Sequence, residues 1–293
     1  TAGDHTNYFF DIQPAYFGEA MDRFAQFFIA PLFAADYVER EKNAVHSEYQ
    51  MQIRADNWRA NAVLNTAINP AHPRARFNIG SLETRGAGVQ EALVEMFDSQ
   101  YSADQMALVA LSSAPLDELE QMIRPMFEAI PNRNIGPAPA SPPLFADGQL
   151  PAVLTFRSIK DGYSVSYNFP VPATTPHYAE KPADYLTNLL GHEGEGSLHQ
   201  ALLARGWIES LSAGSWDIDE RSGLLGVDIE LTPAGYANLD AVTDLVFDFI
   251  ERVRDTWLLR ELIRTSTSAV ERAYDFTGDF DQFVESVEQE IFQ

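Results

Sequence analysis

A proline-rich stretch between residues 131 and 151 most strongly constrains how this chain can fold. It holds six prolines, at positions 131, 137, 139, 142, 143 and 151, and two glycines. Because proline lacks the backbone N–H and interrupts helices and strands, this composition is typical of a linker. The length on either side suits one domain of ordinary size. We therefore predict a first domain over residues 1–133, a linker over 134–151 and a second domain over 152–293.

The composition indicates a folded chain and excludes several functions. Hydrophobic residues make up 45% of the sequence, which is typical of globular domains. The formal net charge is −23 and no basic run occurs, so nucleic acid and membranes are not expected as partners. No apolar stretch is long enough to cross a bilayer. The absence of cysteine excludes disulfides, thiolate metal ligands and cysteine nucleophiles.

The hydrophobic pattern alternates between strand-like and helix-like segments. Strands are predicted at residues 7–12, 106–112, 153–157, 164–169, 209–215 and 224–231. Helices are predicted at residues 19–31, 37–68 with a break near 56, 88–100, 116–129, 183–190, after 197, 239–253 and twice from Trp257 onward. This pattern predicts an α+β fold of two domains, each a mainly antiparallel sheet covered by helices.

The two halves share a strand, loop and helix order. Phe10–Ile12 leads into the first helix, and Val227–Ile229 leads into the helix over residues 239–253. Duplication and coincidence both remain open explanations, because a strand followed by a helix is common.

Two carboxylates lie on one face of the predicted helix over residues 37–68. Glu41 and Glu48 are about 20° apart around the axis and about 10.5 Å apart along it. Their face also carries Ala44, Val45 and Met51. A carboxylate inside an apolar arc needs a cation, a hydrogen-bond cluster or a metal. Two interpretations stay open: rim carboxylates paired with arginines, or carboxylates that serve a metal site.

A second motif, GHEGEGS, occupies residues 191–197. Its three glycines allow a close approach of the backbone, and Ser197 can cap the helix that follows. Phosphate binding is disfavoured because Glu193 and Glu195 repel anions.

Several strings together resemble the insulinase/pitrilysin family of zinc metallopeptidases, the inverted zincins. They are HTNYFFDI, EAMDRFAQFFIAPLF, VEREKNAVHSEYQMQ, INPAHPRARFNIGSLET and LLGHEGEGSLHQALLARGW. The resemblance covers nearly the whole chain except its last part. It implies two related α+β domains, a zinc cofactor and endopeptidase action on peptide substrates. Pitrilysin-like members favour a periplasmic or otherwise extracytoplasmic location.

The resemblance also assigns roles to residues of the first domain. Glu48 falls on the family's third zinc ligand. Glu41 falls on the carboxylate that orients a ligand histidine by accepting its other ring N–H. Trp58 falls on an aromatic residue that shapes an apolar substrate pocket, although an ordinary core tryptophan is an equally good interpretation. His46 stands where members commonly have Asp or Asn, and we expect a surface residue.

In the second domain the resemblance implies a substrate-binding exosite that anchors the amino terminus of a peptide. The residues concerned are Gly191, His192, Glu193, Gly194 and Gly196, with the strand near residues 209–215. Members often have proline where this chain has Glu195. A simple loop at the entry to a helix remains the alternative.

The family's H-x-x-E-H motif, which supplies two zinc ligands and the general base, is absent from the 293 residues. The start at Thr1 also suggests a segment of a longer protein. We therefore expect the segment alone to be inactive, without a complete zinc site and able to self-associate. The alternative is a non-catalytic member that acts as a peptide-binding or structural scaffold. A third, weaker interpretation is an independent acidic peptide-binding domain.

Overall fold

The computed structural model describes residues 5–254, and these form two compact units. Among the described residues, unit 1 contains residues 6–65 and 76–140, whereas unit 2 contains His5, residues 66–75 and residues 141–254. From residue 6 to residue 254, the chain therefore passes between the units three times. The helices expected from Trp257 onward lie outside the described residues. Within residues 5–254, no helix is both long and apolar enough to cross a membrane.

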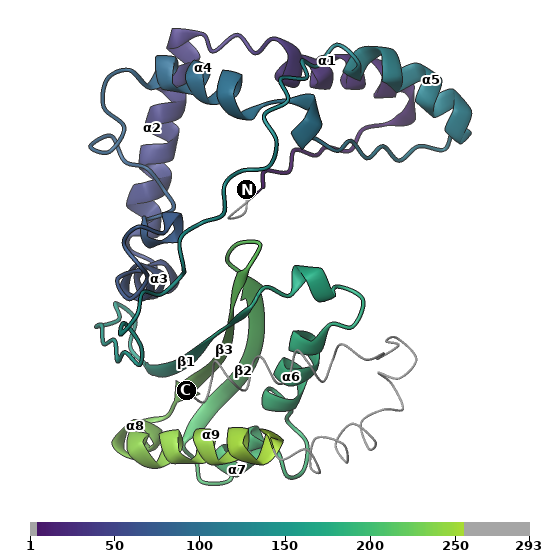
Figure 1. Cartoon of the computed structure of the whole chain (residues 1–293). Coiled ribbons are helices and arrows are strands. Elements are labelled where there is room, and N and C mark those ends of the chain that lie inside the picture. Colours follow the sequence, from purple (N-terminus) through teal and green to yellow (C-terminus); the bar gives the residue numbers. More distant parts are fainter. Residues whose placement is uncertain (1–4, 255–293) are drawn as a thin grey trace. The chain divides into compact units, whose positions relative to one another are not determined.

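Unit 1 is helical throughout its regular structure. Its α-helices are α1 (Phe17–Ile29), α2 (Ala35–Gln52), α3 (Asp56–Asn65), α4 (Val89–Gln100) and α5 (Leu116–Phe127), with short 3-10 turns at Pro14–Tyr16 and Ala103–Gln105. Helix α1 packs against α5 (Figure 1). Apolar residues recur at helical spacing on α1, so that Met21 and Ala25 are buried and Phe24 contacts Phe127 of α5.

The long helix predicted over residues 37–68 is two helices in the structure. Helix α2 ends at Gln52 and α3 begins at Asp56, where Asp56 forms an ion pair with Arg59 at 2.9 Å. The predicted break is therefore present, a few residues earlier than expected.

Unit 2 contains one three-stranded antiparallel sheet covered by helices on one face. The strands are β1 (Tyr163–Pro172), β2 (Ile208–Asp217) and β3 (Ser222–Leu231), in the order β1-β3-β2. The helices are α6 (Pro182–Leu190), α7 (Leu198–Leu203), α8 (Pro233–Ala237) and α9 (Leu239–Arg254), with 3-10 turns at Pro73–Ala75 and Thr175–His177. These bounds confirm the antiparallel sheet and the α+β class predicted from the sequence.

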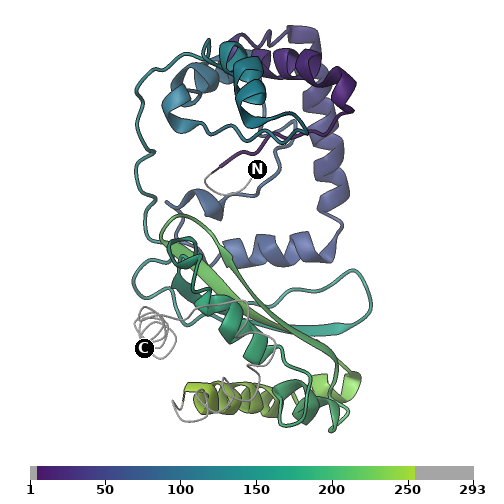
Figure 2. The same ribbon diagram turned by 90° about the vertical axis from the view of Figure 1, so that its right-hand side faces the viewer.

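Alternation along β3 determines which face of the sheet is covered. Leu225, Val227 and Ile229 are buried in one core with side chains of α6, α7 and α9. The ribbons of these helices lie on one side of the sheet (Figures 1 and 2). Asp228 and Glu230 point to the other face and are exposed. Because strand side chains alternate with a period of two, a single apolar face is sufficient to hold the sheet on its helices.

Three predicted strands are absent from the described residues. Residues 7–12, 106–112 and 153–157 form no strand, and Phe9, Val109 and Val153 are exposed. A strand needs a neighbour to satisfy its backbone hydrogen bonds, and no described segment pairs with these three. The described part of unit 1 therefore contributes helices and no strand. The equivalence of Phe10–Ile12 with Val227–Ile229 fails for the same reason, since only the latter lies in a strand.

Candidate functional site

Helix α2 presents the two predicted carboxylates to solvent. Glu41 and Glu48 are exposed, and neither forms a hydrogen bond or an ion pair with any residue from 5 to 254. The polar contacts within α2 involve other side chains, such as the ion pair between Lys42 and Glu39 at 3.0 Å. The interpretation of Glu41 and Glu48 as arginine-paired rim residues therefore finds no support in the described part of the chain.

The apolar arc around these carboxylates is only partly covered. Met51 is 62% exposed, Ala44 is exposed and Val45 is half-buried, whereas Val38 is the buried residue of α2. Glu41 and Glu48 thus lie on an accessible helix face, where both carboxylates are free to take a ligand.

The residues present do not by themselves fit a zinc ion. Catalytic zinc takes three protein ligands with an open position. Between residues 5 and 254, no group of three or more His, Asp or Glu side chains could hold a metal. The exposed carboxylate of Glu48 is chemically suited to be one oxygen ligand. Among residues 5–254, no group of side chains adds the two nitrogen ligands that would complete a zinc site with it.

Trp58 lies within a small aromatic cluster of unit 1. It is half-buried on α3, with its ring centroid 5.7 Å from that of Phe77. Phe77 in turn meets Tyr49 edge to face, also at 5.7 Å. Tyr49 follows Glu48 in α2, so its side chain points about 100° away from that carboxylate around the helix axis. Phe77 could not be predicted from the sequence, because it lies in a loop without periodicity.

The side chain of His46 forms a hydrogen bond with the loop that contains Leu82. It is half-buried, and its Nδ1 accepts a hydrogen bond from the backbone N–H of Leu82 at 3.3 Å. His46 is therefore a partly exposed residue, and the expectation that it is no extra ligand stays a prediction.

The glycine motif of unit 2 connects α6 to α7 beside β2. A Cβ atom at Gly191 would lie 3.2 Å from the backbone nitrogen of Ala213, so glycine allows α6 to end close to β2. Gly196 has a positive φ of 80°, and Ser197 caps α7 by accepting from the N–H of Gln200 at 3.1 Å. The capping role predicted for Ser197 is confirmed.

The other members of the motif are accessible. His192 and Glu193 are exposed, and the imidazole of His192 folds back over Gly194, where a Cβ would approach Nε2 to 2.5 Å. Strand β2 pairs with β3 alone among the described strands, so its outer edge offers unpaired backbone groups. An extended peptide can add to such an edge.

The predicted residues fall into two groups. Glu41, Glu48 and Trp58 belong to unit 1, and the motif at residues 191–196 belongs to unit 2. Sequence reasoning missed a buried pair in unit 2, His72 and Asp219, whose ring nitrogen and carboxylate are 3.0 Å apart.

Two family profiles match the sequence. The profile described as "Insulinase (Peptidase family M16)" matches residues 1–72, and the profile described as "Peptidase M16 inactive domain" matches residues 89–265. Together they extend over most of the chain.

Curated relatives and a solved structure agree with these profiles. "Insulin-degrading enzyme-like 1, peroxisomal" of Arabidopsis thaliana is 36% identical, with 89% of this chain and 28% of the relative covered. "Insulin-degrading enzyme" of Homo sapiens is 33% identical, with 89% and 27% covered. The crystal structure of pitrilysin matches with a TM-score of 0.76 at 28% identity, over 96% of this chain and 31% of that one.

The chain thus spans less than a third of the length of these relatives. The names of the neighbours point to different compartments, since one relative is named peroxisomal and one structural neighbour is a periplasmic protease of Escherichia coli. The extracytoplasmic location therefore stays a prediction.

Proposed function

Because this chain belongs to the insulinase (peptidase M16) family, we propose that it forms part of a zinc-dependent metalloendopeptidase that cleaves peptides. Glu48 supplies one zinc ligand, and Glu41 orients a ligand histidine by accepting its second ring N–H. The two histidines and the general base come from an H-x-x-E-H helix outside these 293 residues. A zinc ion bound by the complete set of ligands would polarise the peptide carbonyl and activate water.

The observation that carries this proposal is the exposed, unpaired state of Glu41 and Glu48 on one face of α2. A carboxylate that serves only solubility can stand anywhere on a helix. Two carboxylates seven residues apart, within a partly apolar arc, are positioned to meet a common partner. A second helix that brings imidazoles to this face would provide that partner.

Peptide substrates would contact this chain at two places. In unit 1, Trp58 with Phe77 and Tyr49 offers an apolar surface for a substrate side chain. In unit 2, the exposed Glu193 is suited to attract the ammonium group of a peptide, and the free edge of β2 is suited to pair with its backbone. Residues Gly191, His192, Gly194 and Gly196 shape the loop at which such a peptide would begin.

The alternative is a non-catalytic scaffold of the same fold. The description "Peptidase M16 inactive domain" for the profile over residues 89–265 favours this role for that part of the chain. For the whole protein, the alternative requires that no zinc binds at α2.

Zinc content of matched variants tests the proposal in the longer protein that supplies the H-x-x-E-H helix. We expect Glu48→Gln to abolish zinc binding, and Glu41→Gln to weaken it about 10- to 100-fold. Glu39→Gln is the control, because Glu39 lies on the same helix but pairs with Lys42 instead. Equal zinc content in all three variants would contradict the assigned roles, and absence of zinc from the wild type would favour the scaffold.

The isolated 293-residue chain should lack activity, since a single carboxylate cannot replace a set of three ligands. Hydrolysis of a fluorogenic peptide is the measurement. Chelator-sensitive cleavage by the purified chain would overturn this part of the proposal.

A further inference from the structure

The sheet of unit 2 has a second face that does not belong to the hydrophobic core. On this face, called the polar face, β3 carries Asp228 and Glu230, and β2 carries Ser210, Ser212 and Trp216. These positions alternate with the residues that are buried against the helices, and all five side chains are exposed. The polar face is therefore open to a ligand at these positions.

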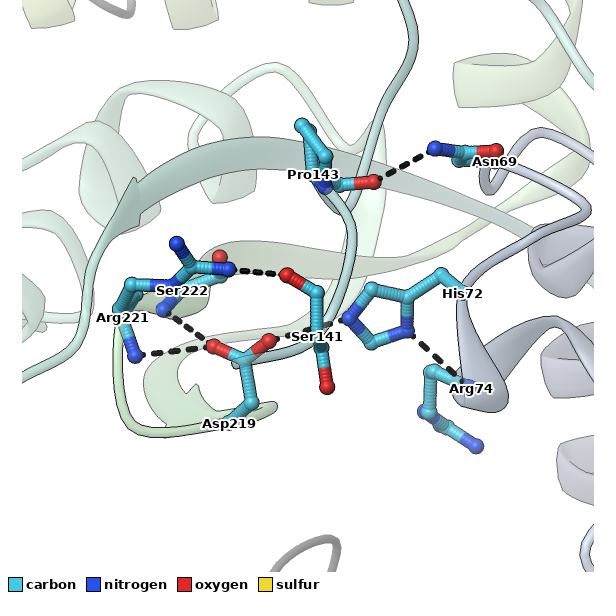
Figure 3. A network of polar contacts seen from close by, with 8 residues as sticks. All are labelled: Asn69, His72, Arg74, Ser141, Pro143, Asp219, Arg221 and Ser222. Carbon is cyan, nitrogen blue, oxygen red and sulfur yellow. Dashed lines mark hydrogen bonds and ion pairs between the residues drawn. The ribbon is translucent and has the colours of Figure 1, made fainter. Parts of the chain in front are cut away.

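The end of the sheet at the β2–β3 turn is held by a buried hydrogen-bond network (Figure 3). Asp219 lies in this turn, and its carboxylate is 3.0 Å from Nε2 of His72. Leu224 follows the turn on β3 and points to the polar face by the same alternation, yet it is only 1% exposed. The polar face is thus closed at Leu224 and open at Asp228 and Glu230.

Asp228 and Glu230 carry two negative charges that the described residues do not neutralise. Ser166 of β1 donates a hydrogen bond from Oγ to Oδ1 of Asp228, which orients this carboxylate and leaves its Oδ2 available. Within residues 5–254, neither Asp228 nor Glu230 forms an ion pair with a basic side chain. The two residues are about 7 Å apart along one face of β3, so their charges repel each other. Two cations with the same spacing would offset this repulsion.

Trp216 adds an aromatic surface next to Asp228. A Cβ atom at Gly226 would lie 3.0 Å from Cη2 and 3.1 Å from Cζ3 of the indole, so the ring extends over Gly226 of β3. Gly226 and Asp228 are neighbours on this face, about 7 Å apart. Trp216 is 37% exposed, so part of its ring is accessible. A guanidinium group bound to Asp228 can therefore also reach the ring, because cation–π contacts act within about 6 Å of a ring centroid.

The small side chains of β2 leave a path from the free edge of the sheet to these groups. Ser212 stands directly opposite Asp228, and Ser210 directly opposite Glu230, in the pairing of β2 with β3. A peptide on the outer edge of β2 would lie about 10 Å from β3, which is two strand spacings. A long basic side chain and a carboxylate together bridge this distance when the residue between them is as small as serine. Two peptide side chains on one face, two positions apart, would meet the two carboxylates.

We propose that the polar face selects peptides that carry two arginines two positions apart. This inference rests on the proposed binding of peptides at the β2 edge, and it adds which side chains that edge prefers. One arginine passes over Ser212 to Asp228, where its guanidinium also contacts Trp216, and the other passes over Ser210 to Glu230. Arginine suits the site better than lysine, because a planar guanidinium can pair with a carboxylate and stack on an indole.

Three matched peptides test the proposal on the 293-residue chain. Each is an extended eight-residue peptide with a free amino terminus and a fluorescent label at its other end. The first has two arginines two positions apart among threonines, the second has citrulline in place of both arginines, and the third has the arginines three positions apart. In the third peptide, the arginines of an extended strand point to opposite faces. Fluorescence anisotropy measures each dissociation constant.

We expect the first peptide to bind about three- to tenfold more tightly than the other two, as for two exposed ion pairs and one cation–π contact. The net charge of −23 attracts every basic peptide. This general attraction acts equally on the two arginine peptides, because their composition is the same. A difference between them therefore reports the spacing of the site.

Two double substitutions separate the site from general charge. Asp228→Asn with Glu230→Gln should abolish the preference for the first peptide. Asp244→Asn with Asp248→Asn is the matched control, because it removes the same charge from exposed positions of α9, which packs on the opposite face of the sheet. Trp216→Leu should weaken binding of the first peptide about threefold and leave the citrulline peptide unchanged.

Equal affinity of the wild type for the two arginine peptides would overturn the proposal, as would an equal loss of preference in the α9 variant. Equal binding of all three peptides would refute the selection of arginine and leave the β2 edge as a general peptide site. Absence of binding by any peptide would refute both this proposal and binding at the β2 edge, whereas the zinc content of Glu48→Gln tests the metal site separately. Circular dichroism identifies a variant that does not fold, and the wild-type comparison then decides alone.

Discussion

At the residue scale, some side chains bind partners a few positions away, as Ser197 does with the N–H of Gln200, and others bind partners far along the chain, as His72 does with Asp219. Glu41 and Glu48 share a face because of helical periodicity alone, and Ser197 caps a helix because of the turn next to it. The pair of His72 and Asp219 was not predictable, since 147 positions separate them and each looks like an ordinary loop residue. Only the folded chain brings such partners together.

Asp219 should contribute to stability in a pH-dependent way. Burial raises the pKa of its carboxyl group, but hydrogen bonds from His72 and from the Arg221 and Ser222 amides outweigh burial and lower it. A group with a lowered pKa stabilises the fold above its unfolded pKa, about 3.9 for Asp, and loses this contribution as the pH falls through the folded value. We expect Asp219→Asn to lower the free energy of unfolding by about 1–3 kcal/mol at neutral pH.

Urea unfolding between neutral pH and about pH 2, below the ordinary pKa of an aspartate, measures this effect. The difference between Asp219→Asn and the wild type should shrink at the acid end. Glu220→Gln serves as the control, because it removes one negative charge from an exposed side chain of the same turn. Identical curves for the two variants would mean that general charge, rather than the hydrogen bonds of Asp219, sets the acid stability.

At the element scale, the accuracy of prediction depends on where a strand finds its partner. The three strands of unit 2 were located within a few residues, because β2 and β3 are joined by a short turn and β1 pairs with β3. The segments at 7–12 and 106–112 have the same apolar composition without a partner among the described residues. Composition indicates a capacity for strand formation, whereas pairing decides whether a strand forms.

The connection from β3 to α9 depends on close contact at Gly235 of α8. Its N–H is bound to Thr232 Oγ1 at 3.0 Å, and a Cβ at this position would lie 1.8 Å from the carbonyl oxygen of Trp207. We expect Gly235→Ala to destabilise unit 2 by about 1–3 kcal/mol, as overpacking does. Gly214→Ala in β2 is the matched control, since nothing lies within 4 Å of its Cβ. Thermal unfolding of the two variants gives the comparison, and equal melting temperatures would contradict the prediction.

At the scale of the whole molecule, charge and exposed apolar surface act against each other. Phe9, Val109 and Leu111 are 86%, 91% and 92% exposed, on segments that form no strand. Unpaired apolar segments of this kind favour association between copies. The net charge of −23 opposes it through mutual repulsion. Salt screens the repulsion over a distance of about 10 Å at 0.1 M but leaves the apolar attraction intact.

The purified chain should therefore self-associate more strongly as ionic strength rises. Sedimentation velocity at low and high salt measures the mean mass, and Val109→Ser combined with Leu111→Ser should keep the chain smaller at high salt. Tyr178→Ser is the control, because Tyr178 is exposed on unit 2 outside these segments. An effect of Tyr178→Ser equal to that of the double substitution would assign the association to general surface hydrophobicity. A mean mass that does not change with salt concentration would show that charge repulsion does not limit association. The exposed apolar segments would then be covered in another way.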